Sequence, residues 1–311
     1  YEQWGQRIAA GDWLGSEVFF QEPLYPYFIG AVYSLAGEPP QGRAVLRRLQ
    51  VLLGASACVL VAGLARRAFG PGPGFVAGLL LALHGPLLLL PAWLLKPNLF
   101  LPLLAGLAWL LILSARAPER ASWRRFLAVG FLSGLGALLR GNMLLLLPLI
   151  CAAPLLLAWS GGQGVRGRTV QGCLAIAAGA LLVLLPVALR NQAVGGVFAL
   201  TTSGAGTNVY GGNNLQNPYG RAAEFDWVRG IPEHEAGDWR REAERRLGRS
   251  LDPGEVSAFW LAETWRSMRL DPLAHGRILW NKLRLTLAGY EVPDNHSYDW
   301  DRRYLGWLRS W

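Results

Sequence analysis

The sequence predicts an all-helical, polytopic membrane protein, and three observations carry that prediction. Six apolar stretches are each about long enough to cross a bilayer, because about 20 apolar residues cover a hydrocarbon core about 30 Å thick. Arginine-bearing connectors separate these stretches and recur at every second loop. The composition is 52% hydrophobic and only 16% charged over 311 residues, which leaves too little polar surface for a soluble fold.

The expected spans follow one another closely and divide the chain into three parts. They cover roughly Val45–Leu64, Phe75–Leu95, Leu99–Leu113, Phe126–Leu139, Met143–Trp159 and Cys173–Leu189. We expect residues 44–190 to form a six-helix transmembrane region and residues 1–43 to form an outer loop with interfacial helices. Residues 191–311 are expected to form a second outer segment with amphipathic helices, leading to a further span.

The distribution of arginine predicts the orientation of these spans. Every second connector is rich in arginine: Arg66 and Arg67, then Arg116, Arg120, Arg124 and Arg125, then Arg166 and Arg168. The intervening turns carry only Lys96 and Arg140. The arginine-rich side is therefore expected to be cytoplasmic and both polar segments to lie outside. Arg43, Arg47 and Arg48 lie on the outer side against this rule, either as a permitted exception or because an anionic group binds there.

Charge and cysteine usage exclude several classes of function. The net charge of +9 is placed at membrane edges, and no basic-aromatic recognition module accompanies it, so we expect lipid headgroups or lipid phosphates as partners and no nucleic acid. Cys58, Cys151 and Cys173 all fall within apolar stretches without CxxC spacing. Neither a disulfide framework nor a cysteine metal site is indicated.

The first outer segment contains a proline-bracketed motif within FFQEPLYPYFIGAVYSLAG. Proline fixes its own backbone angle and restrains the residue before it, so we expect Glu22 and Tyr25 to be held in extended geometry just above the membrane. A carboxylate desolvated there can have a raised pKa suited to proton transfer. The alternative is an interfacial re-entrant piece that its aromatic residues anchor.

Four cations are expected at the outer ends of the spans. Lys96 lies in a turn, Arg140 precedes Gly141 and Asn142 at a tight bend, Arg190 ends the sixth span, and Arg47 lies near the start of the first. Such side chains commonly anchor to headgroups. If they converge, they can instead bind a phosphate and stabilise its developing charge, and we name all four as phosphate-binding candidates.

The second outer segment begins with SGAGTNVYGGNN and continues into helical patterns. Its glycines and asparagines favour a turn-rich loop, and it does not match a dinucleotide-binding signature. Helices are expected over Trp239–Leu247, Pro253–Met268 and Pro272–Leu287, lying against the outer surface or each other, with Asp252 and Asp271 as N-caps. Glu291, Asp294, His296 and Asp299 form a small cluster of polar residues whose spacing matches no metal pattern.

Several of these stretches together resemble one enzyme family. The runs YEQWGQRIAAGDWLGSEVFFQEPLYPYFIGAVYSLAG, KPNLFLPLLAGLAWLL, LLRGNMLLLLPL, RNQAVGGVFALTTSGAGTNVYGGNN and LAGYEVPDN occur in this order. They are similar to bacterial membrane glycosyltransferases of the protein-mannosyltransferase type, grouped as glycosyltransferase family 39 in the multi-spanning GT-C class. The likeness covers nearly the whole chain.

The resemblance implies an active site and a reaction. Such enzymes carry an aspartate just after their first helix, a position that would fall before Tyr1, so we expect the chain to lack that helix, the principal acid and further C-terminal helices. Glu22 is the catalytic candidate among the remaining acids, and Lys96 stands where many relatives carry an acid. The resemblance further implies substrate contacts from Tyr25 and from the loop; the loop candidates are Asn208, Tyr210, Asn213 and Asn214.

The implied activity is inverting transfer of a sugar from a polyprenyl-phosphate donor to an acceptor glycan, lipid or protein. It would take place at the outer face of a bacterial plasma membrane. Two alternatives stay open: a transporter or flippase for a lipid-linked saccharide, and a noncatalytic remnant of the same family. The sequence names no cofactor and leaves a divalent metal open.

Overall fold

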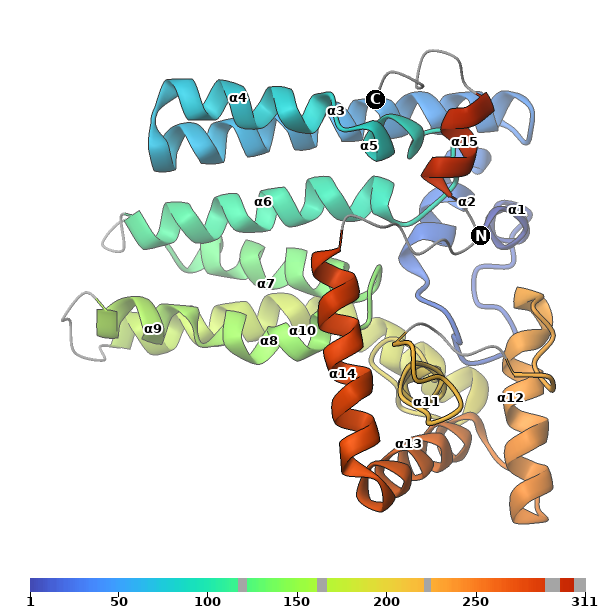
Figure 1. Ribbon diagram of the computed structural model, residues 1–311. Coiled ribbons are helices and arrows are strands. Elements are labelled where there is room, and N and C mark those ends of the chain that lie inside the picture. The colour runs from blue at the N-terminus through green and yellow to red at the C-terminus, as the bar shows by residue number, and fades with distance from the viewer. Residues whose placement is uncertain (117–121, 161–166, 221–224, 289–296, 305–311) are drawn as a thin grey trace. The chain divides into compact units, whose positions relative to one another are not determined.

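The computed structural model describes residues 1–116, 122–160, 167–220, 225–288 and 297–304 (Figure 1). All regular secondary structure in these residues is helical, which confirms the expected all-α class. The helices are α1 (Glu2–Ala9), α2 (Leu24–Ala36), α3 (Gln41–Phe69), α4 (Pro71–Ala82), α5 (Gly85–Leu89), α6 (Pro97–Arg116), α7 (Trp123–Ala137), α8 (Met143–Cys151), α9 (Ala153–Ser160), α10 (Gly167–Gly195), α11 (Ala205–Gly212), α12 (Pro232–Leu247), α13 (Pro253–Leu270), α14 (Pro272–Leu287) and α15 (Tyr298–Tyr304).

The chain forms two compact units. Unit 1 comprises Tyr1–Gly15 and Glu22–Ala188, and unit 2 comprises Ser16–Gln21 and Leu189–Trp311. The boundary between the units falls inside α10. Helices α1 and α2 belong to unit 1 and pack around the buried side chains of Ile8, Ile29 and Tyr33.

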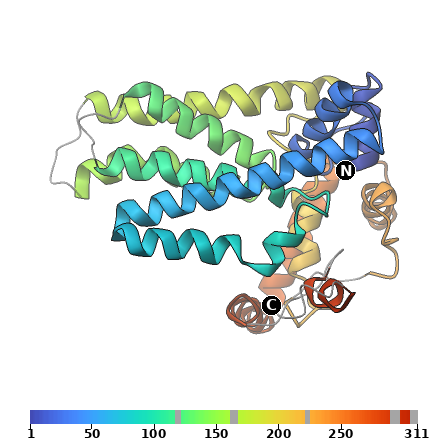
Figure 2. The ribbon, with the colours of Figure 1, turned by 90° about the horizontal axis from the view of Figure 1, so that it is seen from above.

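Within the described ranges, three helices are long and apolar enough to cross a membrane. They comprise Gln41–Phe69, Pro97–Ala115 and Thr169–Gly195, with mean hydropathies of 1.8, 2.0 and 2.5. Their lengths match or exceed the roughly 20 residues that a bilayer requires. Within unit 1 these helices lie alongside α4 and α7, whereas α1 and α2 gather at one end (Figures 1 and 2).

Proline divides two of the six spans that were expected to be continuous. The stretch Phe75–Leu95 becomes α4, the short α5 and a non-helical segment, because Pro86 and Pro91 remove backbone donors that a continuous helix needs. The stretch Met143–Trp159 becomes α8 and α9, since Pro154 has no N–H for the carbonyl of Ile150. The expected six continuous spans are therefore wrong in these places.

The arginine-bearing ends of the unit 1 helices gather at one end of the bundle. The end of α3 with Arg67, the end of α6, the start of α7 and the start of α10 all lie there (Figure 1). The Arg67 guanidinium stacks 4.7 Å from the ring centre of Trp109, and Arg125 donates to the carbonyl of Leu113 at 3.4 Å. The alternation of arginine along the sequence thus corresponds to one physical end of the bundle.

Helices α7 and α10 approach each other at backbone distance. A Cβ atom added at Gly130 would collide with the backbone of Ile176, and one added at Gly179 would collide with the backbone around Leu127. Gly130 and Gly134 form the small-residue spacing G-x-x-x-G, which permits close helix packing within a membrane. These glycines allow the two helices to pack closely, because a larger residue would push them apart.

Unit 2 contains an aromatic core between α12 and α13. Trp239 and the fully buried Trp260 lie at its centre, with ring centres 4.9 Å apart in an edge-to-face arrangement. The expected helix starts are confirmed: Asp252 and Glu255 form a complete capping box at the start of α13, and Asp271 caps α14.

The stretch SGAGTNVYGGNN does not form the expected turn-rich loop. Residues Ala205–Gly212 form helix α11, and no glycine in the stretch has a positive φ. Gly206 instead lies against the backbone of Ser257 on α13, where an added Cβ would collide, and its N–H donates to the Ser257 hydroxyl at 2.9 Å. The glycine provides room for a neighbouring helix rather than a turn.

We predict that Gly130→Ala destabilises unit 1 by about 1–3 kcal/mol, because the added methyl group overpacks the α7–α10 contact. Thermal unfolding of the purified protein in detergent measures the effect. Gly106→Ala on α6 is the matched control, since its nearest neighbour would lie at an ordinary contact distance of 3.9 Å. Equal stability of the two variants would contradict the close approach of α7 and α10.

Candidate functional site

Glu22 lies at the centre of the candidate site in unit 1. Its Oε2 atom is 2.5 Å from Nζ of Lys96, and its Oε1 accepts a 2.9 Å hydrogen bond from the backbone N–H of Gly141. The two charged side chains are only 18% and 19% exposed. One carboxylate therefore joins the start of α2, the start of α6 and the α7–α8 bend. We call Glu22, Lys96 and the backbone of Gly141 the Glu22 bridge.

Local sequence explains how Glu22 reaches this position. Pro23 is the N-cap of α2 and Pro26 lies in its first turn, where a missing N–H costs nothing. Leu24 donates its N–H to the carbonyl of Leu138 at 3.2 Å, which ties the start of α2 to the end of α7. The proline motif thus starts a helix, and the expected extended geometry of Tyr25 is wrong.

Asn98 fixes the segment that carries Lys96. The side-chain amide of Asn98 is buried and donates to the carbonyls of Leu90, Trp93 and Leu95 at 2.8, 3.0 and 3.1 Å. These hydrogen bonds from Asn98 hold the non-helical residues before α6 in one conformation. The Lys96 ammonium, which follows directly, also lies 5.6 Å from the ring centre of Tyr1.

The pKa of the Glu22 carboxyl is lowered from its ordinary value of 4.5. Burial alone would raise this pKa, but the positive charge of Lys96, its hydrogen bond and the N–H of Gly141 together outweigh that effect. The expectation of a raised pKa is therefore wrong. Glu22 is an anion at neutral pH, and its geometry suits it to orient Lys96 rather than to exchange a proton.

Tyr25 is fully buried beneath the surface of unit 1 and takes part in a chain of hydrogen bonds. Its hydroxyl donates to Oε1 of Gln50 at 2.6 Å, and the Gln50 amide donates to the carbonyl of Pro91 at 3.3 Å. The rings of Tyr1 and Tyr25 are arranged edge to face, with their centres 5.6 Å apart. Tyr25 has no exposed surface and packs the interior of unit 1, and its contact with a substrate stays a prediction.

Arg43 and Arg47, in the first turns of α3, lie near an acid of the same unit. Glu2 on α1 accepts from Nε of Arg43 at 2.7 Å and from the hydroxyl of Tyr33 at 2.6 Å. Burial would raise the pKa of Glu2, yet its bonds to Arg43 and Tyr33, together with the charges of Arg43 and Arg47, lower it. Glu2 therefore supplies an anionic partner for Arg43 and Arg47.

The four candidate phosphate-binding cations are distributed over both units. Lys96 is in the Glu22 bridge, and the exposed Arg140 directly precedes Gly141 of that bridge. Arg47 is exposed on α3 near Glu2. Arg190 belongs to unit 2, where its guanidinium donates to the carbonyl of Glu17 at 2.6 Å and stacks 3.8 Å from the ring centre of Phe19.

The four remaining candidates belong to unit 2 and differ in exposure. Asn214 is 2% exposed, and its side-chain amide donates to carbonyls of α11. The ring centres of Tyr210 and Trp260 lie 4.7 Å apart in the aromatic core. Asn213 accepts from Nζ of Lys282 at 2.7 Å. Asn208 alone among the four is exposed, and no hydrogen bond of its side chain is found among the described residues.

Sequence reasoning missed several members of the site. Tyr1, Gln50 and Asn98 were not predicted as site residues. A glutamine or an asparagine inside an apolar stretch nevertheless indicates buried hydrogen bonding. Among the residues that the structure describes, no three metal-ligating side chains lie close enough to hold an ion. Glu291, Asp294 and His296 lie outside the described residues, as does the side chain of Asp299.

Comparison with known proteins places this geometry in a family. A family model described as dolichyl-phosphate-mannose-protein mannosyltransferase matches residues 21–189, more than half of the 311 residues. No curated protein and no solved structure matches the chain. The matched region contains the whole Glu22 bridge and Arg140. The chain therefore belongs to the dolichyl-phosphate-mannose-protein mannosyltransferase family of membrane glycosyltransferases, which use a lipid-linked sugar donor.

Proposed function

We propose that this protein transfers a sugar from a polyprenyl-phosphate donor to an acceptor glycan, lipid or protein, with inversion at the anomeric carbon. The acceptor oxygen forms a bond to the anomeric carbon as the bond to the phosphate oxygen breaks. The proton of the acceptor hydroxyl passes to solvent, and polyprenyl phosphate leaves. The family match and the Glu22 bridge inside the matched region support this proposal.

The Glu22 bridge is the observation that carries the proposed chemistry. A lysine ammonium has three N–H donors, and the bond to Glu22 uses one of them. The other two can bind the oxygens of a phosphate and stabilise its charge as the sugar leaves. Glu22 then acts as a positioning residue, because it fixes the ammonium between α2 and α6. Arg140, one residue from Gly141, adds a second cation that can bind the same phosphate.

The position of the bridge supports action at the outer face of a bacterial plasma membrane. Arginine-bearing helix ends occupy one end of unit 1, and by the positive-inside rule that end faces the cytoplasm. The starts of α2 and α6, which hold Glu22 and Lys96, lie at the opposite end (Figure 1). In unit 2, the exposed amide of Asn208 is the candidate for contact with sugar hydroxyls.

We predict that Lys96→Ala lowers the rate of sugar transfer about 100-fold or more, as expected for losing one preorganised donor to a developing negative charge. The measurement is release of polyprenyl phosphate from labelled mannosyl-phosphoryl-polyprenol by the purified protein. A wild-type protein that moves this lipid across vesicles without releasing polyprenyl phosphate would contradict transfer and favour a flippase.

Arg48→Ala is the matched control for this variant, because Arg48 is an exposed cation on α3 outside the bridge. It should retain wild-type activity. A folded Lys96→Ala variant with wild-type activity would remove Lys96 from the site.

We predict that Glu22→Gln destabilises the protein at neutral pH and that the difference from wild type shrinks in acid. Because the folded-state pKa lies below the ordinary 4.5, the Glu22 carboxylate stabilises the fold above pH 4.5. This stabilisation is lost as the pH falls through the folded-state pKa. Thermal unfolding at a series of pH values measures it. The control Glu38→Gln, at an exposed acid without an ion pair among the described residues, should not change stability. A Glu22→Gln difference that is independent of pH would contradict an ionised Glu22.

A further inference from the structure

Helix α14 is fixed to unit 2 along one of its faces. His275 is buried with Nε2 3.1 Å from the carbonyl of Asn213, and Nζ of Lys282 donates to Oδ1 of Asn213 at 2.7 Å. Asn281 donates to the carbonyl of Pro218 at 2.7 Å. These bonds determine which face of α14 is turned away from unit 2.

The opposite face of α14 is apolar and exposed. Leu273, Trp280 and Leu287 are 77%, 60% and 79% exposed, and they recur every seven residues, so they form one line along the helix. Arg277 and Arg284 have the same spacing and lie beside this line. We call these five residues the α14 stripe.

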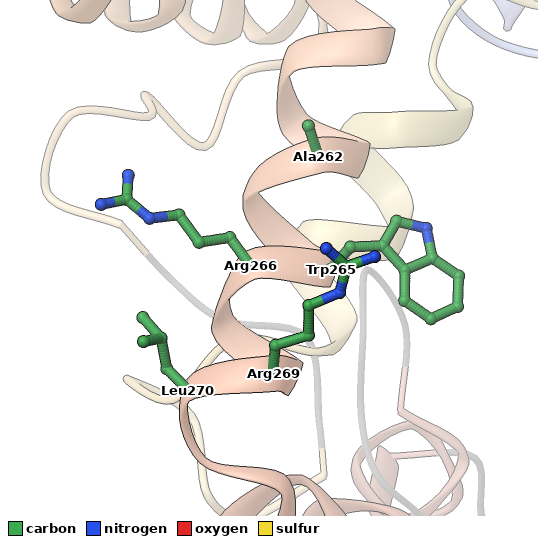
Figure 3. Close-up of a pocket in the computed structure, with 5 residues that line it drawn as sticks. All are labelled: Ala262, Trp265, Arg266, Arg269 and Leu270. Atoms are coloured by element: carbon green, nitrogen blue, oxygen red, sulfur yellow. The ribbon is translucent and has the colours of Figure 1, made fainter.

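The corner between α13 and α14 continues this character. Leu270 is 77% exposed just before Asp271, and a shallow depression on α13 is lined by Ala262, Trp265, Arg266, Arg269 and Leu270. In Figure 3, Arg266 and Leu270 extend to one side of the helix and Trp265 to the other. Tryptophan, leucine and arginine therefore share the surface of both helices at their junction.

The positive charge of α14 and the end of α13 favours an anionic partner. Between Ala262 and Leu287 the chain has four arginines and one lysine against two acids. Asp271 caps α14, and Glu263 lies 3.6 Å from Arg266. Among the described residues no carboxylate pairs with Arg269, Arg277 or Arg284. A surface of this kind matches the boundary between anionic headgroups and acyl chains.

We propose that the α14 stripe docks unit 2 onto an anionic phospholipid surface. Leu273, Trp280 and Leu287 enter the boundary between headgroups and acyl chains, and Arg277 and Arg284 bind lipid phosphates. Unit 1 of the same chain has helices long and apolar enough to cross a bilayer, so the chain joins unit 2 to a part of the protein suited to lie in lipid. This inference is independent of the proposed transfer reaction.

The test places a fluorescent label on the stripe in proteoliposomes. Cys58, Cys151 and Cys173 are replaced by alanine, and a single cysteine is introduced by Leu273→Cys, by Leu287→Cys or, as an exposed control away from the stripe, by Ser250→Cys. Brominated lipids then report contact with the bilayer through quenching. The vesicles contain either phosphatidylcholine alone or phosphatidylcholine mixed with phosphatidylglycerol.

We expect quenching at positions 273 and 287 in the mixed vesicles, weaker quenching without phosphatidylglycerol, and none at position 250. Arg277→Ala and Arg284→Ala should each lower the ratio of docked to undocked label about fivefold, as expected for one cation near an anionic surface. Labels at positions 273 and 287 that are quenched no more than the control at position 250 would overturn the proposal. Quenching of equal strength in vesicles with and without phosphatidylglycerol would exclude an anionic surface and would also overturn it.

Discussion

The contact on which the candidate site depends is the ion pair between Glu22 and Lys96, completed by the N–H of Gly141. It joins three segments that are far apart in the sequence and holds two charges in a largely buried position. A pair of this kind is costly to break from one side, because the remaining charge is then left without a partner. The same arrangement keeps Glu22 ionised and leaves Lys96 with donors for an anion.

Local features were predictable from the sequence, because each depends on a few neighbouring residues. Asp252 and Glu255 define the start of α13, and Asp271 with Pro272 defines the start of α14. The all-helical membrane class followed from long apolar stretches. The interruptions near Pro86 and Pro154 could not be predicted from proline alone, because Pro102, Pro148 and Pro186 lie inside continuous helices.

The site itself was predictable as a set of residues but not as an arrangement. Glu22 and Lys96 are separated by 74 positions, and no local pattern indicates that they meet. The contact also lowers the pKa of Glu22, which burial alone would raise. The sequence indicates the burial but does not show the partner. Glycine was similarly misread: Gly206 and Gly130 provide room for adjacent helices, whereas the sequence alone favoured turns around Gly206.

The most direct test of this account is a double-mutant cycle of Glu22→Gln and Lys96→Met, measured as the free energy of unfolding in detergent micelles at neutral pH. If the two side chains form a buried pair, the double variant should be more stable than the sum of the single effects predicts, by about 1 kcal/mol or more. Single effects that add within about 0.3 kcal/mol would show that the side chains do not interact, and would contradict the Glu22 bridge.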